Sequence, residues 1–341
     1  MQDILARFGL TGPVSPLGSG HINDSYRVGE DHLLQRINHR VFSDVAGLMH
    51  NVDLVTRHLR RKIAAATGEA AGQQTLKIVP TRGGALFVQD GAGNYWRVYE
   101  FLRHLRSYDL LETPEQAYAG ARAYGHFLCF LDDFPTGRAV STIPNFHNVV
   151  SRLAALRAAV RTDARKRLRE CTGEVSRALT RAGRMSVIQH AWEAGRLRTR
   201  ITHNDTKFNN VMFDAEGHAR CVVDLDTVMP GLVHFDLGDA IRTGAATASE
   251  DEADLRIVGA DPEKLRALTE GYLSVTRDVL TPEELSLLPR SGELLAYLMA
   301  VRFLTDFLAG DRYYKTAYPT HNLVRARNQL RLVEELEALR K

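Results

Sequence analysis

The residues best suited to carry chemistry lie in one short segment, 203–210, and at one position beyond it. The segment reads His-Asn-Asp-Thr-Lys-Phe-Asn-Asn, so it contains Asp205, Lys207 and Asn210, and Asp224 follows fourteen residues after Asn210. Phosphoryl transfer needs a carboxylate that orients the acceptor hydroxyl and takes its proton. It also needs an amide and a second carboxylate that hold magnesium, and a cation that offsets the phosphate charge. The pattern therefore predicts the catalytic centre of a kinase.

Two short apolar runs connect Asn210 to Asp224. Residues 211–214 and 219–223 have strand patterns, and the turn between them contains glycine. A hairpin built from these runs returns Asp224 to the side of Asn210. Magnesium prefers hard oxygen ligands, with water and phosphate completing its octahedron. We therefore predict Asn210 and Asp224 as metal ligands, with Asp205 as the catalytic base and Lys207 as the catalytic cation.

A simpler interpretation of part of this motif exists. A lone His-x-Asp is equally compatible with two capping residues at an ordinary turn. The full pattern His-x-Asp-x-Lys-x-x-Asn, with an aspartate at the end of a downstream strand, is far more specific.

The composition is that of an ordinary globular protein with room for two lobes. The chain has 341 residues, of which 44% are hydrophobic and 25% charged. Its net charge of +3 is too small to indicate nucleic-acid binding. Basic residues cluster between 152 and 184, but acidic residues interrupt them and aromatic residues are missing there. This stretch therefore indicates solvated helix surfaces, with an anionic partner as the weaker alternative.

The cysteines and the apolar runs indicate the cellular compartment in which the protein is expected. Cys129, Cys171 and Cys221 lie far apart without metal-binding spacing, as is typical of proteins from a reducing environment. No apolar run approaches the roughly 18 residues of a membrane span, and the N-terminal run is too short and too charged for a signal peptide. We therefore expect a cytoplasmic, monomeric protein without a membrane partner or a zinc site.

The elements that must position the motif fall into two parts. Residues 1–102 predict a small antiparallel sheet and one helix that begins near Ser43 or Asp44. Strand patterns occur at 23–28, 32–37, 75–80, 85–89 and 95–102. Residues 103–341 predict a mainly helical lobe. Its helices are expected at 114–131, 150–169, 173–198, 237–246, 263–278, 282–309 and 320–339, and its only strands are those of the hairpin. This order is that of an α+β, protein-kinase-like fold with two lobes.

A glycine-containing segment precedes the strand at 23–28. In it, Ser19 and Gly20 would let backbone N–H groups approach nucleotide phosphates. A plain surface turn explains the same residues about as well. The chain contains no Gly-x-x-x-x-Gly-Lys-[Ser/Thr] segment, which argues against a P-loop kinase.

The rest of the nucleotide side departs from the protein-kinase pattern. Arg36 stands on the strand where protein kinases place a lysine, and a guanidinium can grip phosphate, although an exposed strand residue is the alternative. The following helix offers no glutamate to pair with it. Tyr99 and Phe101 lie where the connector between the lobes would offer backbone groups to adenine.

Taken together, these motifs resemble the aminoglycoside phosphotransferase-like kinases, and among them most closely the N-acetylhexosamine 1-kinases. The segment 203–242 is the most specific part of the resemblance, and shorter matches occur at 34–38, 94–99 and 302–306. The resemblance implies ATP-dependent phosphorylation of the anomeric hydroxyl of N-acetylglucosamine or N-acetylgalactosamine, with Mg²⁺ as cofactor. The residues that it implies as sugar contacts are Asp205, Asp224, Thr227, Arg302 and Tyr313.

Some of these residues have purely structural alternatives. Arg302 lies one helical turn before Asp306, which is suitable spacing for an ion pair, and Tyr313 beside Tyr314 is compatible with packing. Asp236 and Asp239 lie at the start of a predicted helix. We expect both to brace the catalytic loop and not to touch substrate.

Two other functions are compatible with the sequence. One is a related kinase for an amino alcohol or an aminoglycoside, against which an arginine in the acceptor pocket argues. The other is a nucleotide-binding pseudokinase, suggested by the missing lysine and glutamate of the sheet lobe. The complete set of catalytic-loop residues argues against the second.

Overall fold

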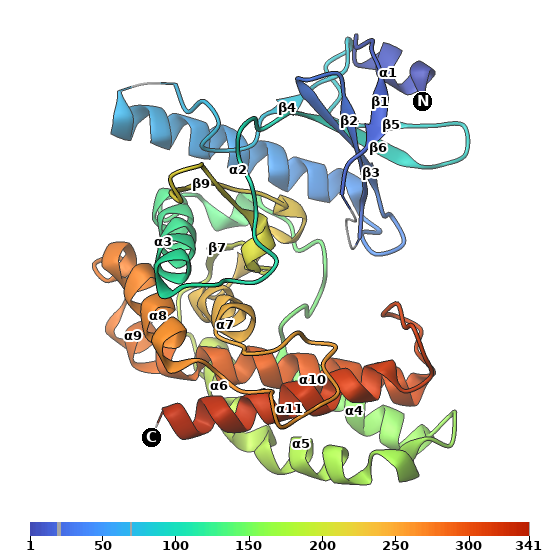
Figure 1. Cartoon of the computed structure of the whole chain (residues 1–341), viewed down its shortest axis with the longest axis vertical. Helices are drawn as coiled ribbons and strands as arrows, with labels where there is room; N and C mark the ends of the chain where they lie inside the picture. The colour runs from blue at the N-terminus through green and yellow to red at the C-terminus, as the bar shows by residue number, and fades with distance from the viewer. Residues whose placement is uncertain (19–21, 69, 341) are drawn as a thin grey trace.

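An antiparallel sheet forms the first lobe of the computed structural model, which describes residues 1–18, 22–68 and 70–340 (Figure 1). Its strands follow the order β1-β2-β3-β6-β4, and β5 also pairs with β6. Their bounds are β1 Val14–Pro16, β2 Asp24–Val28, β3 His32–Ile37, β4 Ile78–Val79, β5 Val88–Gln89 and β6 Tyr95–Glu100. The predicted sheet is confirmed, whereas β1 and the short N-terminal helix α1 (Gln2–Arg7) were not predicted.

The two faces of this sheet pack against different partners. Leu34 of β3 and Val98 of β6 lie in a small core that also contains residues of α1. Because successive side chains of a strand point to opposite faces, the residues between them face the other way. Gln35 and Arg97, which are register partners, therefore point toward α2 and the second lobe.

Helix α2 (Val45–Thr67) lies between the sheet and the second lobe, as Figure 1 shows. It begins after Asp44, whose carboxylate accepts the Gly47 N–H, so the predicted start is confirmed. The buried amide of Asn51 fastens the helix to the second lobe. It donates to the carbonyls of Val140 and Val228 at 2.8 and 2.9 Å.

The second lobe is mainly helical, as predicted, and is built around α10. This helix is almost entirely buried and packs against α4, α7 and α11. The helices are α3 Pro114–Phe130, α4 Val149–Thr162, α5 Thr172–Met185, α6 Val187–Glu193, α7 Val233–Gly244, α8 Pro262–Thr276, α9 Pro282–Leu287, α10 Ser291–Ala309 and α11 His321–Leu339. Together with the sheet lobe they form a kinase-like fold of two lobes.

Three predicted helices are interrupted in the structure. The predicted helix 150–169 ends at Asp163, which has a left-handed backbone (φ 36°) and whose carboxylate caps Arg167 and Leu168. The predicted helix 173–198 divides at Ser186, and 282–309 divides at a short 3-10 turn that contains Pro289. A second pair of strands, β7 (Arg200–Thr202) and β10 (Met229–Gly231), was also missed.

The described part of the chain contains no helix that is long and apolar enough to cross a membrane. Its three cysteines are free thiols, of which Cys171 and Cys221 are buried.

The close approach of α7 to α10 depends on Gly238. A Cβ at this position would lie 2.4 Å from the carbonyl oxygen of Ser291, so the helices would have to separate. We expect Gly238→Ala to reduce the free energy of unfolding by about 1–3 kcal/mol, as overpacking typically does. Urea unfolding followed by circular dichroism measures this change.

Gly183 of α5 provides the matched control, because nothing lies within 4 Å of a Cβ added there. Gly183→Ala should leave stability unchanged or raise it by up to about 1 kcal/mol. Equal effects of the two substitutions would contradict the packing argument.

Candidate active site

The loop that follows β7 is held by the first turn of α7. The carboxylate of Asp236 accepts the backbone N–H groups of His203 and Asn204 at 2.9 and 2.7 Å. The hydroxyl of Thr206 donates to the Asp236 carbonyl at 2.5 Å. Burial raises the pKa of Asp236 to about 6, while the amides favour its charged form. The predicted bracing role of Asp236 is confirmed, whereas Asp239 pairs with Arg242 at 2.7 Å and makes no hydrogen bond to the loop within the described residues.

A left-handed backbone at Asn204 (φ 65°) turns the chain into the catalytic motif. The Asn204 side chain supports this conformation by donating to the carbonyls of Thr202 and Thr227 at 3.1 and 3.0 Å. From α3, the hydroxyl of Tyr124 donates to the carbonyl of Lys207 at 2.6 Å. Three separate elements thus fix the backbone on both sides of Asp205.

The side chains of Asp205 and Lys207 form an ion pair. Lys207 Nζ lies 3.2 Å from Asp205 Oδ1. Burial alone would raise the pKa of Asp205, but Lys207, His203 and Arg242 together outweigh it and hold that pKa below its ordinary value. The carboxylate raises the pKa of Lys207 in return. Both groups are therefore charged at neutral pH, as a proton acceptor and a phosphate-neutralising cation require.

The predicted hairpin forms and returns the chain to Asn210. Strands β8 (Val211–Phe213) and β9 (Ala219–Val222) pair with Val211 opposite Val222, and the Val223 N–H donates to the Asn210 carbonyl at 2.9 Å. Asp224 follows directly, with a left-handed backbone (φ 55°). The structure thus brings Asn210 and Asp224 together as the sequence predicted.

The two predicted metal ligands offer oxygen atoms that accept no hydrogen bond from the described residues. Asn210 donates its amide N–H to the Asp205 carbonyl at 2.9 Å, which leaves its own oxygen free. Across the described residues, the Asp224 carboxylate makes no hydrogen bond or ion pair. Desolvation raises the pKa of Asp224, and the nearby carboxylates of Asp226 and Asp205 raise it further. An amide oxygen beside a carboxylate that has no direct hydrogen-bond or ion-pair partner among the described residues fits Mg²⁺.

The structure places Arg36 on the sheet face opposite to that of Arg97, away from the second lobe, which corrects its predicted role. Its side chain is on the same face of the sheet as Leu34, and it pairs with Asp24 on β2, with both side chains roughly half exposed. The cation that points inward is Arg97 on the neighbouring strand β6. It is buried and forms an ion pair with Asp226 at 2.5 Å.

The pair of Arg97 and Asp226 was not predicted, because Arg36 was taken as the inward cation of the sheet. That assignment was open because β3 contains two adjacent leucines, Leu33 and Leu34. Either of them could have been the buried residue, so the alternation did not fix which face Arg36 occupies. The register of β3 against β6 resolves this question. The only available signal was that Trp96 and Val98, on either side of Arg97, are apolar.

The other predicted nucleotide contacts have different outcomes. Ser19 and Gly20 lie outside the described residues. Tyr99 is buried, with the Arg97 guanidinium 5.1 Å from its ring centre. The Phe101 N–H donates to the Asp31 carbonyl at 2.7 Å, so this backbone donor is already used within the sheet lobe and is not free for adenine.

The predicted sugar contacts differ in exposure, since Thr227 is buried and Tyr313 is exposed. Thr227 is buried and its hydroxyl donates to the His203 carbonyl at 2.6 Å, which leaves only an oxygen lone pair for a ligand. Tyr313 is 56% exposed. Within the described residues Arg302 forms no ion pair with a carboxylate, so the expected alternative, a pair with Asp306, is wrong.

Arg302 lies instead among aromatic rings. The centres of the Phe146, Tyr313 and Tyr314 rings lie 5.1, 5.6 and 5.5 Å from its guanidinium carbon. The neighbour of Phe146, His147, bonds through Nε2 to the Asn204 carbonyl at 2.9 Å. This contact connects the aromatic cluster to the residue that precedes Asp205.

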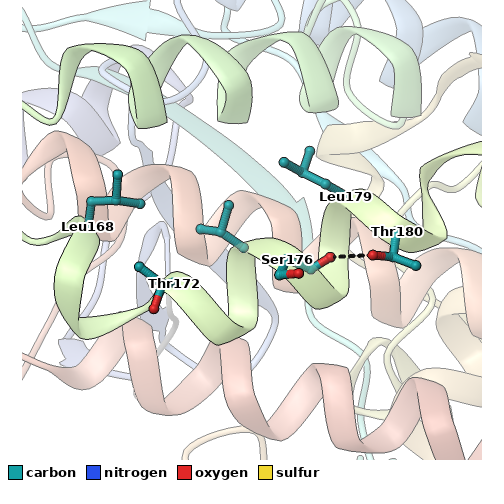
Figure 2. A pocket seen from close by; sticks show the side chains of 6 residues that line it. Leu168, Thr172, Ser176, Leu179 and Thr180 are labelled. Atoms are coloured by element: carbon teal, nitrogen blue, oxygen red, sulfur yellow. Dashed lines mark hydrogen bonds between the residues drawn. The ribbon is translucent and has the colours of Figure 1, made fainter.

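A separate cavity lies in the helical lobe, on α5 and the short 3-10 turn before it (Figure 2). Its lining consists of aliphatic and hydroxyl side chains, and one of the hydroxyls, Thr180 Oγ1, donates to the Ser176 carbonyl at 2.9 Å. None of its lining residues is acidic, basic or a predicted site residue. The lining residues are Leu168, Thr172, Val175, Ser176, Leu179 and Thr180.

The fold and this site define a phosphotransferase of the kinase-like class, and solved structures share the fold. An aminoglycoside phosphotransferase from Alicyclobacillus acidocaldarius superposes with a TM-score of 0.64 at 16% identity, covering 100% of this chain and 94% of the other. A microcompartment-associated aminopropanol kinase gives 0.59 at 14% identity, covering 99% and 96%. Amicoumacin kinase hAmiN, in complex with AMP-PNP, Ca²⁺ and Ami, gives 0.57 at 16% identity, covering 97% and 92%.

The sequence matches the model of one family, described as the phosphotransferase enzyme family, over residues 13–268. The chain belongs to this family.

Two buried histidines near the site should make stability depend on pH. Burial lowers the pKa of His147 and of His234 to about 4, from about 6.5 in an unfolded chain. Unfolding therefore takes up protons between these values, so stability should fall as the pH falls through this window. Replacement of either histidine by glutamine should reduce the proton uptake near pH 5 by about one. The slope of the unfolding free energy against pH measures this proton uptake. An unchanged slope in both variants would contradict the lowered pKa of these histidines.

Proposed function

We propose that this chain is an ATP-dependent kinase that phosphorylates the anomeric hydroxyl of an N-acetylhexosamine, giving the sugar 1-phosphate and ADP. The observation that carries the kinase assignment is the arrangement of Asp205, Lys207, Asn210 and Asp224 on one braced loop and hairpin. Family membership supports the same reaction class.

In this mechanism each residue has one task. Asp205 orients the acceptor hydroxyl and takes its proton, and Lys207 offsets charge on the transferred phosphoryl group. Asn210 and Asp224 would hold Mg²⁺, which neutralises and orients the nucleotide phosphates when it is bound. Transfer is direct, because no nucleophilic side chain is required between donor and acceptor.

The acceptor assignment depends on Arg302. An unpaired guanidinium beside the acceptor position repels an amine, whereas it can donate hydrogen bonds to an acetamido carbonyl or a sugar hydroxyl. The surrounding rings of Phe146, Tyr313 and Tyr314 offer flat apolar faces of the kind that line small-molecule sites. These features favour a neutral acetylated sugar over an amino alcohol or an aminoglycoside.

Removal of the proposed base tests the kinase assignment. Asp205→Asn keeps the size of the side chain but removes the proton acceptor, so turnover should fall by several orders of magnitude while ADP binding persists. Release of ADP in a coupled assay measures turnover, and calorimetry measures binding. Asp214→Asn, in the turn of the same hairpin, should retain activity near that of the unmodified protein. Turnover that survives in Asp205→Asn would exclude Asp205 as the base.

A panel of free sugars and amino alcohols tests the acceptor. N-acetylglucosamine or N-acetylgalactosamine should give the highest kcat/KM, and phosphorus NMR should place the phosphate on the anomeric oxygen. Arg302→Ala should raise the KM for the sugar about tenfold or more, as loss of a charged hydrogen-bond donor predicts. The exposed Arg312→Ala is the control and should leave KM unchanged. Preference for an amino alcohol, or a phosphate at another hydroxyl, would exclude the sugar assignment while keeping the kinase assignment.

A further inference from the structure

A buried ion pair joins the sheet lobe to the loop that carries Asp224. Asp226, two residues after Asp224, is 2% exposed and pairs with Arg97 of β6 at 2.5 Å. Its second carboxylate oxygen accepts a hydrogen bond from the Asn23 amide at 2.7 Å. Asn23 in turn accepts the Asn38 N–H at 3.0 Å. Asp226 is thus bound by two separate parts of the sheet lobe.

The partner of Asp226 is itself held in place. The Arg97 Nε and Nη2 atoms donate to the Gln35 side-chain oxygen at 3.1 and 2.9 Å, and Gln35 donates to Ser25 Oγ at 3.0 Å. Gln35 occupies the inward position on β3 next to Arg36. The guanidinium therefore cannot change direction without breaking its contacts to Gln35 of β3, whose side chain is itself held by Ser25 of β2.

Among the described residues, no ion pair corresponds to the usual lysine–glutamate pair of a kinase sheet lobe. Protein kinases pair a lysine on the third strand with a glutamate on the adjacent helix. Here α2 contains no glutamate, and its one acidic residue, Asp53, pairs with Arg57 at 2.8 Å on the surface. Helix α2 is instead fastened to the second lobe by the neutral amide of Asn51.

From this geometry we infer that Arg97 and Asp226 are positioning residues for Asp224, so that the sheet lobe holds the metal-binding loop directly through β6, in addition to the contact that α2 makes through Asn51. The inference rests on the proposed function, because it takes Asp224 as a ligand of Mg²⁺. With the pair intact, the Arg97 charge is directed at Asp226, and Asp224 stays available for the metal. Without Asp226, the buried guanidinium has Asp224 as the nearest alternative carboxylate on that loop, and it competes with the metal for it.

Metal binding to the ADP complex tests the inference without any acceptor. ADP is first titrated into the full chain in chelator, and Mg²⁺ is then titrated into the ADP complex, both by calorimetry. Asp226→Asn and Arg97→Gln should raise the Mg²⁺ concentration at half-saturation about tenfold or more, as loss of a group that orients a metal ligand typically does. Affinity for ADP in chelator should stay within about threefold of the unmodified protein. The exchanged pair Arg97→Asp with Asp226→Arg should recover part of the loss.

A second buried pair, which makes no hydrogen bond or ion pair with Asp224 or Asp226 among the described residues, provides the control. Arg200 and Glu284 are as buried as Arg97 and Asp226, and their closest atoms lie 2.8 Å apart. Glu284→Gln should lower the melting temperature without changing the half-saturation by Mg²⁺. If Asp226→Asn does not fold, Asn23→Ala leaves the ion pair with Arg97 intact while it removes the contact to the second carboxylate oxygen and the acceptor of the Asn38 N–H, and it should give a smaller increase.

Each result decides the inference. Folded variants with unchanged Mg²⁺ half-saturation would overturn it, and so would an Arg97→Gln variant that loses ADP affinity in chelator, since Arg97 would then be a phosphate ligand. If the unmodified protein binds ADP and Mg²⁺ but phosphorylates no sugar, the acceptor assignment fails and the variants still decide the positioning role. If it binds neither, both proposals fail.

Discussion

The geometry of the active site depends on one buried carboxylate, Asp236. Two consecutive backbone N–H groups, those of His203 and Asn204, can point at the same carboxylate only if the chain turns sharply, and the left-handed backbone of Asn204 provides this turn. The turn directs Asp205 toward the hairpin that carries Asp224. Because Asp236 belongs to α7, which packs closely on α10 through Gly238, the position of the catalytic loop is set by the core of the helical lobe.

Charge pairing within this site leaves one acidic group without compensation. Asp205 pairs with Lys207, Asp226 with Arg97 and Asp239 with Arg242, while Asp236 is compensated by backbone amides. Burying an acid without such a partner is costly, so the protein pairs three of them internally. Asp224 is the remaining acid, and it is the one beside the free oxygen of Asn210. Asp224 is exposed, so its carboxylate can remain without an internal partner, and this is consistent with the metal-ligand role proposed for it.

The sequence was informative wherever a function depends on residues close together in the chain. The motif 203–210, the hairpin and the bracing by Asp236 involve short separations and strong local patterns, so they could be predicted. Arg97 and Asp226 are 129 residues apart, and no local pattern joins them. The face that Arg36 occupies depended on strand register, which two adjacent leucines left undetermined. The N-terminal helix and the strands β7 and β10 were missed because each is too short to show a clear periodicity.

The acceptor side shows why suitable spacing on a helix does not establish an ion pair. Asp306 lies one turn after Arg302, yet its carboxylate accepts the N–H groups of Arg312, Tyr313 and Tyr314. A carboxylate that satisfies three backbone donors gains more than one that makes a surface ion pair, because unsatisfied donors are costly whereas such pairs contribute little. This competition has two effects that favour ligand binding. It orders the loop that presents Tyr313 and Tyr314, and it leaves Arg302 without a carboxylate partner among the described residues, which is consistent with the substrate contact proposed for it.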